Sequence, residues 1–444
     1  MKTIIRVKQA VIKHPFELGN NKDIIIEDGV IVDICDAGMD KYNNYDFIDF
    51  SNYIATPSFI QTHVHLCQTL FRGLADNVEL LDWLKKYIFP LECFHDDRSM
   101  SASVKIGICE LFKTGTTTIM DIGSIYHEDV IIDEVEKSGM RAFLGKAMMD
   151  INELYPKFKE TTKDSLESSY RFAKEIANKK NAKLNYAFTP RFILSCTDEL
   201  LLDAYEMHKE FGSLYHTHAS ENKNEMKTVY KRTGKRNIEV FYDMGLLGET
   251  SCFAHCIWLD ENEIDMIAKT SSKVLHCPSS NFKLSSGIAD IPKYLSKGIC
   301  VSLSSDGAPC NNNLSQLMEM RQAAFVKRTK SPVFISATKT FELATINGAK
   351  TLHKEKEIGS IEIGKKADII FWDLDMVWNP LIKENIESLL SAIVYSSSTE
   401  NINSVMIDGK FVIKNKENLL YDETELFRNG KHELKKNMER AGLR

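Results

Sequence analysis

The chain has 444 residues, of which 43% are hydrophobic, and its formal net charge is −6. This length and composition predict a folded protein with a large core that exceeds a typical single domain. The weakly acidic balance leaves no broad basic surface, which excludes nucleic acid and anionic lipid as main partners, so we expect a small-molecule substrate.

The N-terminus and the cysteines indicate a cytoplasmic protein. The first 19 residues interrupt short apolar stretches with Arg6, Lys8 and Lys13, which gives neither a signal-peptide core nor a membrane span. The ten cysteines form no CxxC pair, a pattern that fits reduced thiols better than disulfides or a structural zinc site. We therefore expect no membrane segment and a cytoplasmic location.

Both ends of the chain predict short strands separated by turns. The clearest strand-like runs are residues 24–27, 30–34, 367–372 and 404–410. Asp28-Gly29 between the first two runs is a hairpin signal. The simplest architecture joins residues 1–56 and 354–444 in one small composite β-sandwich domain. Its last segment, Asp422 to Arg444, predicts a charged helix.

The middle of the chain, residues 57–353, alternates apolar runs with longer helical stretches. This pattern is typical of parallel strands joined by crossover helices. Eight expected strands end near His65, Asp121, Lys146, Pro190, His218, Cys256, Cys277 and Asp306. Eight such units predict an α/β fold of the TIM (β/α)8 barrel type, in which the chemistry gathers at the C-terminal ends of the strands.

The residues at these strand ends include a candidate metal-ligand set. His63 and His65 are two apart on one strand, so both side chains face the same way. His218 and Asp306 end two other expected strands. Three neutral imidazoles and one carboxylate suit zinc or ferrous iron, and an ion with an open position lowers the pKa of water toward neutrality. Asp306 can also accept the proton of that water, although an aspartate before Gly307 is equally typical of a turn.

Two further side chains are candidates for acid–base work. Glu221 follows His218 by three residues and can carry a proton. His255 ends the next expected strand, where it can hydrogen-bond the nucleophile or the developing anion. His216 is expected to pack lower in the barrel, and His276 to have a structural role in a loop.

Taken together, these motifs resemble those of the amidohydrolase superfamily nearly from end to end. The resemblance rests on residues 57–65, 218–221, 254–256, 276–281 and 305–307. Residues 59–92 and 308–313 resemble more closely a branch that contains deaminases acting on 5'-deoxyadenosine, methylthioadenosine and S-adenosylhomocysteine, together with triazine hydrolases, and within it they look most like 5'-deoxyadenosine deaminases.

The resemblance implies a role for each motif residue. His63, His65, His218 and Asp306 would bind one divalent ion, which we expect to be zinc, with iron as the alternative. Glu221 would protonate a ring nitrogen, His255 would stabilise the attacking hydroxide, and Glu92 would accept hydrogen bonds from ribose hydroxyls. The implied reaction deaminates a 5'-modified adenosine to the inosine analogue and releases ammonia. One ion rather than two is expected, because Thr189-Pro190-Arg191 lacks the lysine that bridges two metals in related barrels.

Arg191 departs from the pattern of the adenosine-type branch. Homocysteine-type deaminases usually carry a histidine there that contacts the substrate, so we expect Arg191 to bind the substrate. Guanine deaminases have a similar Pro-Arg-Phe, so guanine and triazines are alternative substrates on the same scaffold. Against guanine, the residues after Asp306 differ from those of guanine deaminases, and Glu92 would lack an obvious partner.

Three further expectations complete the hypothesis. Residues 146–159 contain no arginine to clamp an amino-acid carboxylate, which favours a small or apolar 5' substituent over homocysteine. A barrel that has lost catalysis is disfavoured, because the ligands, Glu221 and His255 are all present. Homologous barrels often self-associate, so we expect a homo-oligomer.

Overall fold

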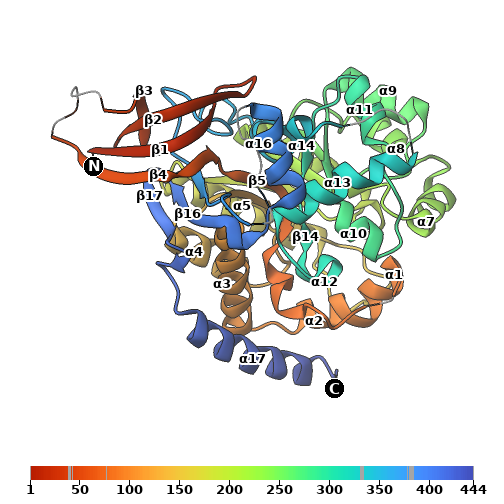
Figure 1. Ribbon diagram of the computed structural model, residues 1–444. Helices are drawn as coiled ribbons and strands as arrows, with labels where there is room; N and C mark the ends of the chain where they lie inside the picture. Colours follow the sequence, from red (N-terminus) through yellow and green to blue (C-terminus); the bar gives the residue numbers. More distant parts are fainter. Residues whose placement is uncertain are drawn as a thin grey trace. The chain divides into compact units, whose positions relative to one another are not determined.

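The computed structural model describes residues 2–38, 42, 44–76, 78–330, 335–377, 379 and 385–443. These residues form two compact units (Figure 1). One unit comprises residues 1–60, 109–117 and 315–422, and the other comprises residues 61–108, 118–314 and 423–444. The expected domain boundaries at residues 56/57 and 353/354 stay a prediction.

The first unit contains an eight-stranded sheet built from both ends of the chain, as predicted. Its order is β18-β17-β16-β15-β4-β1-β2-β3. The strands are β1 (Lys2–Ile12), β2 (Glu17–Glu27), β3 (Val30–Asp36), β4 (Asp46–Pro57), β15 (Ile369–Trp372), β16 (Ile402–Ile407), β17 (Lys410–Lys414) and β18 (Glu417–Asn418). The two ends meet where β15 runs antiparallel to β4, with Ile369 opposite Pro57. Asp28 and Gly29 both have positive φ, as the predicted hairpin turn requires.

The first unit also carries four α-helices in the described residues after position 315. They are α13 (Gln316–Lys330), α14 (Ala337–Ala344), α15 (Ile346–Thr351) and α16 (Ile386–Ser391).

The other sheet confirms the predicted (β/α)8 barrel. Its strands are β5 (Phe59–His65), β6 (Thr116–Asp121), β7 (Arg141–Leu144), β9 (Leu184–Pro190), β10 (Leu214–Ala219), β11 (Ser251–His255), β12 (Lys273–His276) and the interrupted pair β13 (Val301–Leu303) and β14 (Asp306–Gly307). A two-residue strand, β8 (Ala147–Met148), pairs with β9. The ring closes because β13 pairs with β12 while β14 pairs with β5.

Helices connect the barrel strands as expected for crossover units. They are α3 (Asp97–Lys113), α4 (Glu128–Ser138), α5 (Thr162–Asn178), α6 (Asp198–Phe211), α7 (Lys223–Thr233), α8 (Asn237–Asp243), α9 (Glu261–Thr270), α10 (Pro278–Lys283), α11 (Ile291–Ser296) and α12 (Ala308–Asn311). Before α3, an insertion after β5 forms η2 (Leu66–Phe71), α1 (Leu80–Trp83), η3 (Leu84–Ile88) and α2 (Phe89–Cys93). Its apolar side chains join one core cluster with Phe158 and Phe192.

The C-terminal helix α17 (Glu423–Arg440) belongs to the unit that contains most of the barrel, and it lies alongside α3 and α2 (Figure 1). Gly430 permits this close approach, because a Cβ there would lie 2.4 Å from Ile106 Cδ1 of α3. Arg440 Nε donates to the carbonyl of Phe94 at 2.9 Å, and Asn437 Nδ2 donates to that of Leu91 at 3.2 Å. Arg444 lies outside the described residues.

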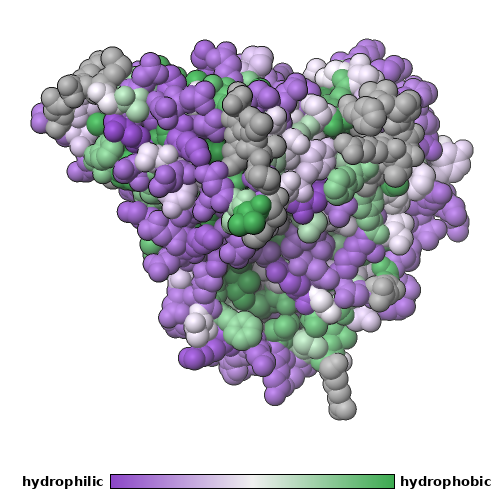
Figure 2. All heavy atoms as spheres, viewed as in Figure 1, coloured by the Kyte–Doolittle hydropathy of each residue, from purple (hydrophilic) through white to green (hydrophobic). Residues whose placement is uncertain are grey.

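Hydrophilic side chains cover most of the face shown in Figure 2, as expected for a chain with 27% charged residues. Among the described residues no helix is both long and apolar enough to cross a membrane.

His95 links the end of α2 to the start of α3. Its Nε2–H donates to the carbonyl of Cys67 at 2.8 Å, its Nδ1 accepts from Ser99 Oγ at 2.9 Å, and its ring stacks on Phe71. Burial lowers the pKa of His95 from 6.5 to about 4. Between pH 6.5 and about 4, His95 is therefore protonated in the unfolded chain and neutral in the folded chain.

We expect His95 to destabilise the fold as the pH falls from 6.5 toward 4. Relative to His95→Gln, the wild type should lose about 3 kcal/mol of unfolding free energy over this interval, at about 1.4 kcal/mol per pKa unit. Urea unfolding at several pH values measures the difference, with the exposed His432→Gln as the control. Parallel curves for the wild type and His95→Gln would contradict the assignment.

Candidate metal centre and substrate pocket

The pairing of β5 with β14 places three of the predicted ligands together. Asp306 lies opposite Val64, between His63 and His65. The Oδ1 atom of Asp306 is 3.4 Å from His63 Nε2 and 3.3 Å from His65 Nε2. The ring of His218, from β10, is 4.8 Å from that of His63 between centroids. The structure therefore brings the four predicted ligands together at one end of the barrel.

The ligand atoms fall into two overlapping groups that could hold an ion. His63, His65 and His218 form one group, and His63, His255 and Asp306 form the other, each with its donor atoms within 4.8 Å of one another. His255, which is predicted to stabilise the attacking hydroxide, therefore shares a donor group with two of the predicted metal ligands.

Hydrogen bonds behind the histidines fix how they face the centre. His218 Nδ1 donates to the carbonyl of Arg191 at 2.7 Å, which leaves its Nε2 lone pair for the centre. His63 Nδ1 lies 2.8 Å from His216 Nε2, so His216 contacts a candidate ligand from within the barrel, lower than the site. Ser280 Oγ donates to Asp306 Oδ2 at 2.7 Å and fixes this carboxylate.

The chemistry of the donor set fits a divalent ion. His63 Nε2 is buried and has no hydrogen-bond partner in the described part of the chain. Burial holds the pKa values of His65 and His218 well below the ordinary value, so both imidazoles are neutral. Burial alone would raise the pKa of Asp306, but His63, His65 and His255 hold it well below its usual range. Neutral imidazoles with an ionised carboxylate are the ligands that zinc and ferrous iron take.

Glu221 and His255 face each other beside this centre. Their Oε2 and Nε2 atoms are 3.5 Å apart. Burial raises the pKa of Glu221 to about 7. Burial would lower the pKa of His255, but the carboxylates of Glu221 and Asp306 outweigh it and raise that pKa. His255 Nδ1 is 2.9 Å from Asn281 Oδ1, which orients the ring.

Three residues of the site adopt the left-handed backbone region that non-glycine residues rarely occupy. The φ angles are 54° for Ser220, 72° for His255 and 66° for Asp306. Such strain concentrates where surrounding structure holds a functional side chain in place.

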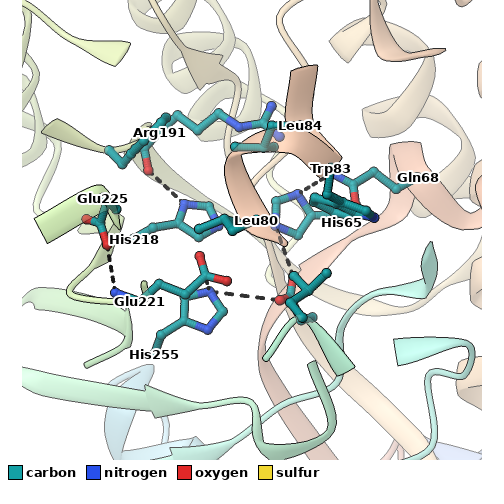
Figure 3. Close-up of a pocket in the computed structure, with 13 residues that line it drawn as sticks. His65, Gln68, Leu80, Trp83, Leu84, Arg191, His218, Glu221, Glu225 and His255 are labelled. Atoms are coloured by element: carbon teal, nitrogen blue, oxygen red, sulfur yellow. Dashed lines mark hydrogen bonds and ion pairs between the residues drawn. The ribbon is translucent and has the colours of Figure 1, made fainter. Parts of the chain in front are cut away.

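A pocket of about 40 Å³ opens beside these groups. Its walls include His65, Gln68, Leu80, Trp83, Leu84, Arg191, Phe192, His218, Glu221, Glu225, His255, Leu284 and Asp306. In Figure 3, Arg191 lies on one side of His218, and Glu221 and His255 lie on the other. The sequence analysis missed Gln68 and the apolar wall, although Leu80, Trp83 and Leu84 have the i, i+3, i+4 spacing of one helix face.

Two of the residues predicted to bind substrate, Arg191 and Glu92, are placed differently. Arg191 lines the pocket, whereas Glu92 is wholly buried and is absent from its wall. Arg191 Nη1 donates to Glu92 Oε2 at 2.8 Å, and Arg191 Nη2 donates to Glu92 Oε1 at 3.1 Å. The prediction that Glu92 would lack a partner in a guanine pocket is therefore wrong, because Glu92 pairs with Arg191.

A second cavity of about 580 Å³ shares Phe192 with the first. Its wall is largely apolar, with Leu81, Phe89, Met149 and Leu154, but Glu153, Lys231 and Arg232 also line it. The two cations come from α7, outside the segment 146–159 that contains no arginine.

The amidohydrolase family pattern matches residues 54–412 of the chain. The sequence is similar to that of the 5'-deoxyadenosine deaminase of Methanobrevibacter smithii, with 33% identity over 427 residues and 96% of each chain covered. It is also similar to the 5-methylthioadenosine/S-adenosylhomocysteine deaminase of Syntrophomonas wolfei, with 34% identity over 408 residues and 91% of each chain covered.

Solved structures share the fold. An adenosine deaminase from Xanthomonas campestris with bound zinc superposes with a TM-score of 0.91 at 23% identity, over 98% of both chains. Guanine deaminase from C. acetobutylicum with bound guanine superposes with a TM-score of 0.83 at 27% identity, over 93% of this chain and 100% of that one.

If the four predicted ligands hold one ion, His63→Ala should lose it. We expect elemental analysis to find about one divalent ion per wild-type chain and less than about a tenth of that in His63→Ala, because one lost imidazole opens a buried ligand set. His276→Gln is the control, since His276 is also buried but lies outside both donor groups. Unchanged metal content in His63→Ala would contradict the ligand assignment.

Proposed function

We propose that this chain, which belongs to the amidohydrolase family, hydrolytically deaminates a 5'-modified adenosine to the inosine analogue and releases ammonia. The observation that carries the proposal is the meeting of Glu221 and His255 beside the candidate metal ligands in one buried pocket. The relatives named as 5'-deoxyadenosine and methylthioadenosine/S-adenosylhomocysteine deaminases support the adenosine class.

We assign His63, His65, His218 and Asp306 as the ligands of one divalent ion. When bound there, the ion supplies Lewis-acid chemistry that lowers the pKa of water toward neutrality. Zinc is our first expectation and ferrous iron the alternative, because the same donors serve both. The zinc in the adenosine deaminase structure supports this preference.

The remaining residues move protons and position the attacking oxygen. Glu221, with a pKa of about 7, can take a proton from water and deliver it to a ring nitrogen near neutral pH. His255 and Asp306 lie beside it, where His255 stabilises the attacking oxygen. Water adds at the carbon that bears the exocyclic amine, and its first proton reaches the ring nitrogen through Glu221. Asp306 accepts the second water proton and passes it to the amine, so that the carbon–nitrogen bond breaks, the oxygen stays on the ring as a carbonyl and the amine leaves as ammonia.

The 5' substituent that we favour is small or apolar, as in 5'-deoxyadenosine or methylthioadenosine. The apolar part of the second cavity supports this preference. Lys231 and Arg232 in its wall keep S-adenosylhomocysteine among the substrates to be compared.

Guanine deamination is the second candidate. Arg191 in the pocket wall favours it, because a guanidinium there can donate to a purine oxygen or nitrogen. The similarity to guanine deaminase from C. acetobutylicum supports the same alternative.

Turnover of a substrate panel by metal-replete protein tests the choice. We expect the highest kcat/KM for 5'-deoxyadenosine or methylthioadenosine, at least about tenfold above those for guanine and S-adenosylhomocysteine. Guanine has no ribose to bind, and S-adenosylhomocysteine would place a charged amino-acid group in an apolar 5' site. Loss of ultraviolet absorbance by the amino-heterocycle measures the rate. Activity on guanine alone would replace the first proposal with the second.

Glu221→Gln should separate metal binding from proton transfer. We expect kcat to fall by about two to four orders of magnitude, as for loss of a general acid–base group, while metal content stays at the wild-type value. Single-turnover rates and elemental analysis measure the two effects. Near-normal turnover with full metal content would remove Glu221 from the mechanism.

A further inference from the structure

Glu92 lies behind the pocket wall rather than in it. The residue is 0% exposed, and it belongs to α2. Its two oxygens accept hydrogen bonds from both terminal nitrogens of Arg191, and Oε1 also accepts from Gln68 Nε2 at 2.7 Å. Arg191 and Gln68 line the pocket and Glu92 does not. A ligand in the pocket therefore meets Arg191 and Gln68 first.

The ion pair between Glu92 and Arg191 fixes the orientation of the Arg191 guanidinium. A guanidinium that donates two parallel hydrogen bonds to one carboxylate has its plane fixed by that carboxylate. Arg191 is only 3% exposed, so its charge needs a partner. Its guanidinium carbon also lies over the ring of Phe89, 5.1 Å from the ring centroid.

Both wall residues keep hydrogen-bonding capacity for a ligand. A guanidinium has five N–H groups, and the described residues accept only two of those of Arg191. Gln68 Oε1 is buried without a partner in the same part of the chain, and its Nε2 is committed to Glu92 Oε1 at 2.7 Å and to His65 Nδ1 at 3.3 Å. The amide oxygen fits there because residue 307 is glycine, where a Cβ would lie 2.2 Å from it.

The position of α2 is fixed on both sides of Glu92. The C-terminal helix α17 donates to the carbonyl of Leu91 through Asn437 and to that of Phe94 through Arg440. Arg440 also pairs with Asp96 at 2.9 Å. This contact gives the charged C-terminal helix a role in placing Glu92.

We propose that Glu92 is a positioning residue that holds Arg191 and Gln68, and that these two residues, not Glu92, recognise the substrate. This proposal rests on the proposed function and changes the role that the sequence predicts for Glu92. The pair offers N–H donors beside one acceptor, which complements a substrate edge with adjacent acceptor and donor atoms. The two ribose hydroxyls of an adenosine form such an edge.

A double-mutant cycle on 5'-deoxyadenosine tests the proposal. We expect Glu92→Gln to raise KM at least about tenfold and to change kcat less than about fivefold, because the groups at the reacting carbon are untouched. Adding Glu92→Gln to Arg191→Ala should cost no more than about twofold in kcat/KM, since Glu92 acts through Arg191. A further tenfold loss in the double variant would show that Glu92 contacts the substrate by itself and would overturn the proposal.

A matched control separates positioning from stability. Glu263 is also 0% exposed and pairs with an arginine, Arg236, at 2.7 Å, but it lines neither cavity. We expect Glu263→Gln to leave KM within about twofold of the wild type, whatever it does to the unfolding midpoint. A tenfold rise in KM for this variant as well would assign the effect of Glu92→Gln to general destabilisation, against the proposal.

The two proposals fail in different ways. If the wild type deaminates no adenosine, the proposed function fails. The positioning role is then decided by a crystal structure of metal-loaded Glu92→Gln, in which we expect the Arg191 guanidinium to leave its wild-type position. An unmoved guanidinium would overturn the positioning role regardless of the substrate.

Discussion

The structure depends on the pairing of β5 with β14. These short parallel contacts close the barrel, and the same register places Asp306 between the two histidines of β5. The contacts that close the barrel therefore also assemble part of the candidate metal centre. A shift of one residue in the register of β5 would turn both histidines away from the site. Side chains reinforce the closure, because His63 N donates to Ser304 Oγ at 2.8 Å and Ser305 N donates to Gln61 Oε1 at 3.0 Å.

Burial shifts the pKa values of the ionisable groups in the site, and it also requires a partner for each buried charge. Four histidines, four carboxylates and one arginine lie within or directly behind the wall of the pocket, and all of them except His218 are buried. In such surroundings each charge needs a specific partner, and each neutral imidazole needs a hydrogen bond that fixes its tautomer. The raised pKa of Glu221 and the lowered pKa of Asp306 show how neighbours decide the outcome, because burial acts on both in the same direction.

Elements outside the eight strands complete the pocket. The insertion between β5 and α3 supplies the apolar cover through Leu80, Trp83 and Leu84. Its α2 also supplies Glu92, which contacts the strand-end residue Arg191 across 99 positions of the sequence. The last helix of the chain then anchors α2. Substrate recognition in our proposals thus draws on segments that the barrel topology alone does not require.

The sequence by itself determined the barrel, the sheet made from both chain ends and the grouping of the four candidate ligands. It could do so because strand alternation and the C-terminal ends of parallel strands obey local periodicity, so that His63, His65, His218 and Asp306 reveal their placement one strand at a time. Only the tertiary structure decided that Glu92 faces Arg191 instead of the pocket, that Lys231 and Arg232 reach the second cavity, and that α17 braces α2. These contacts join residues that are far apart in the sequence and share no periodic pattern, and their side-chain directions are fixed by packing and by the need to pair buried charges.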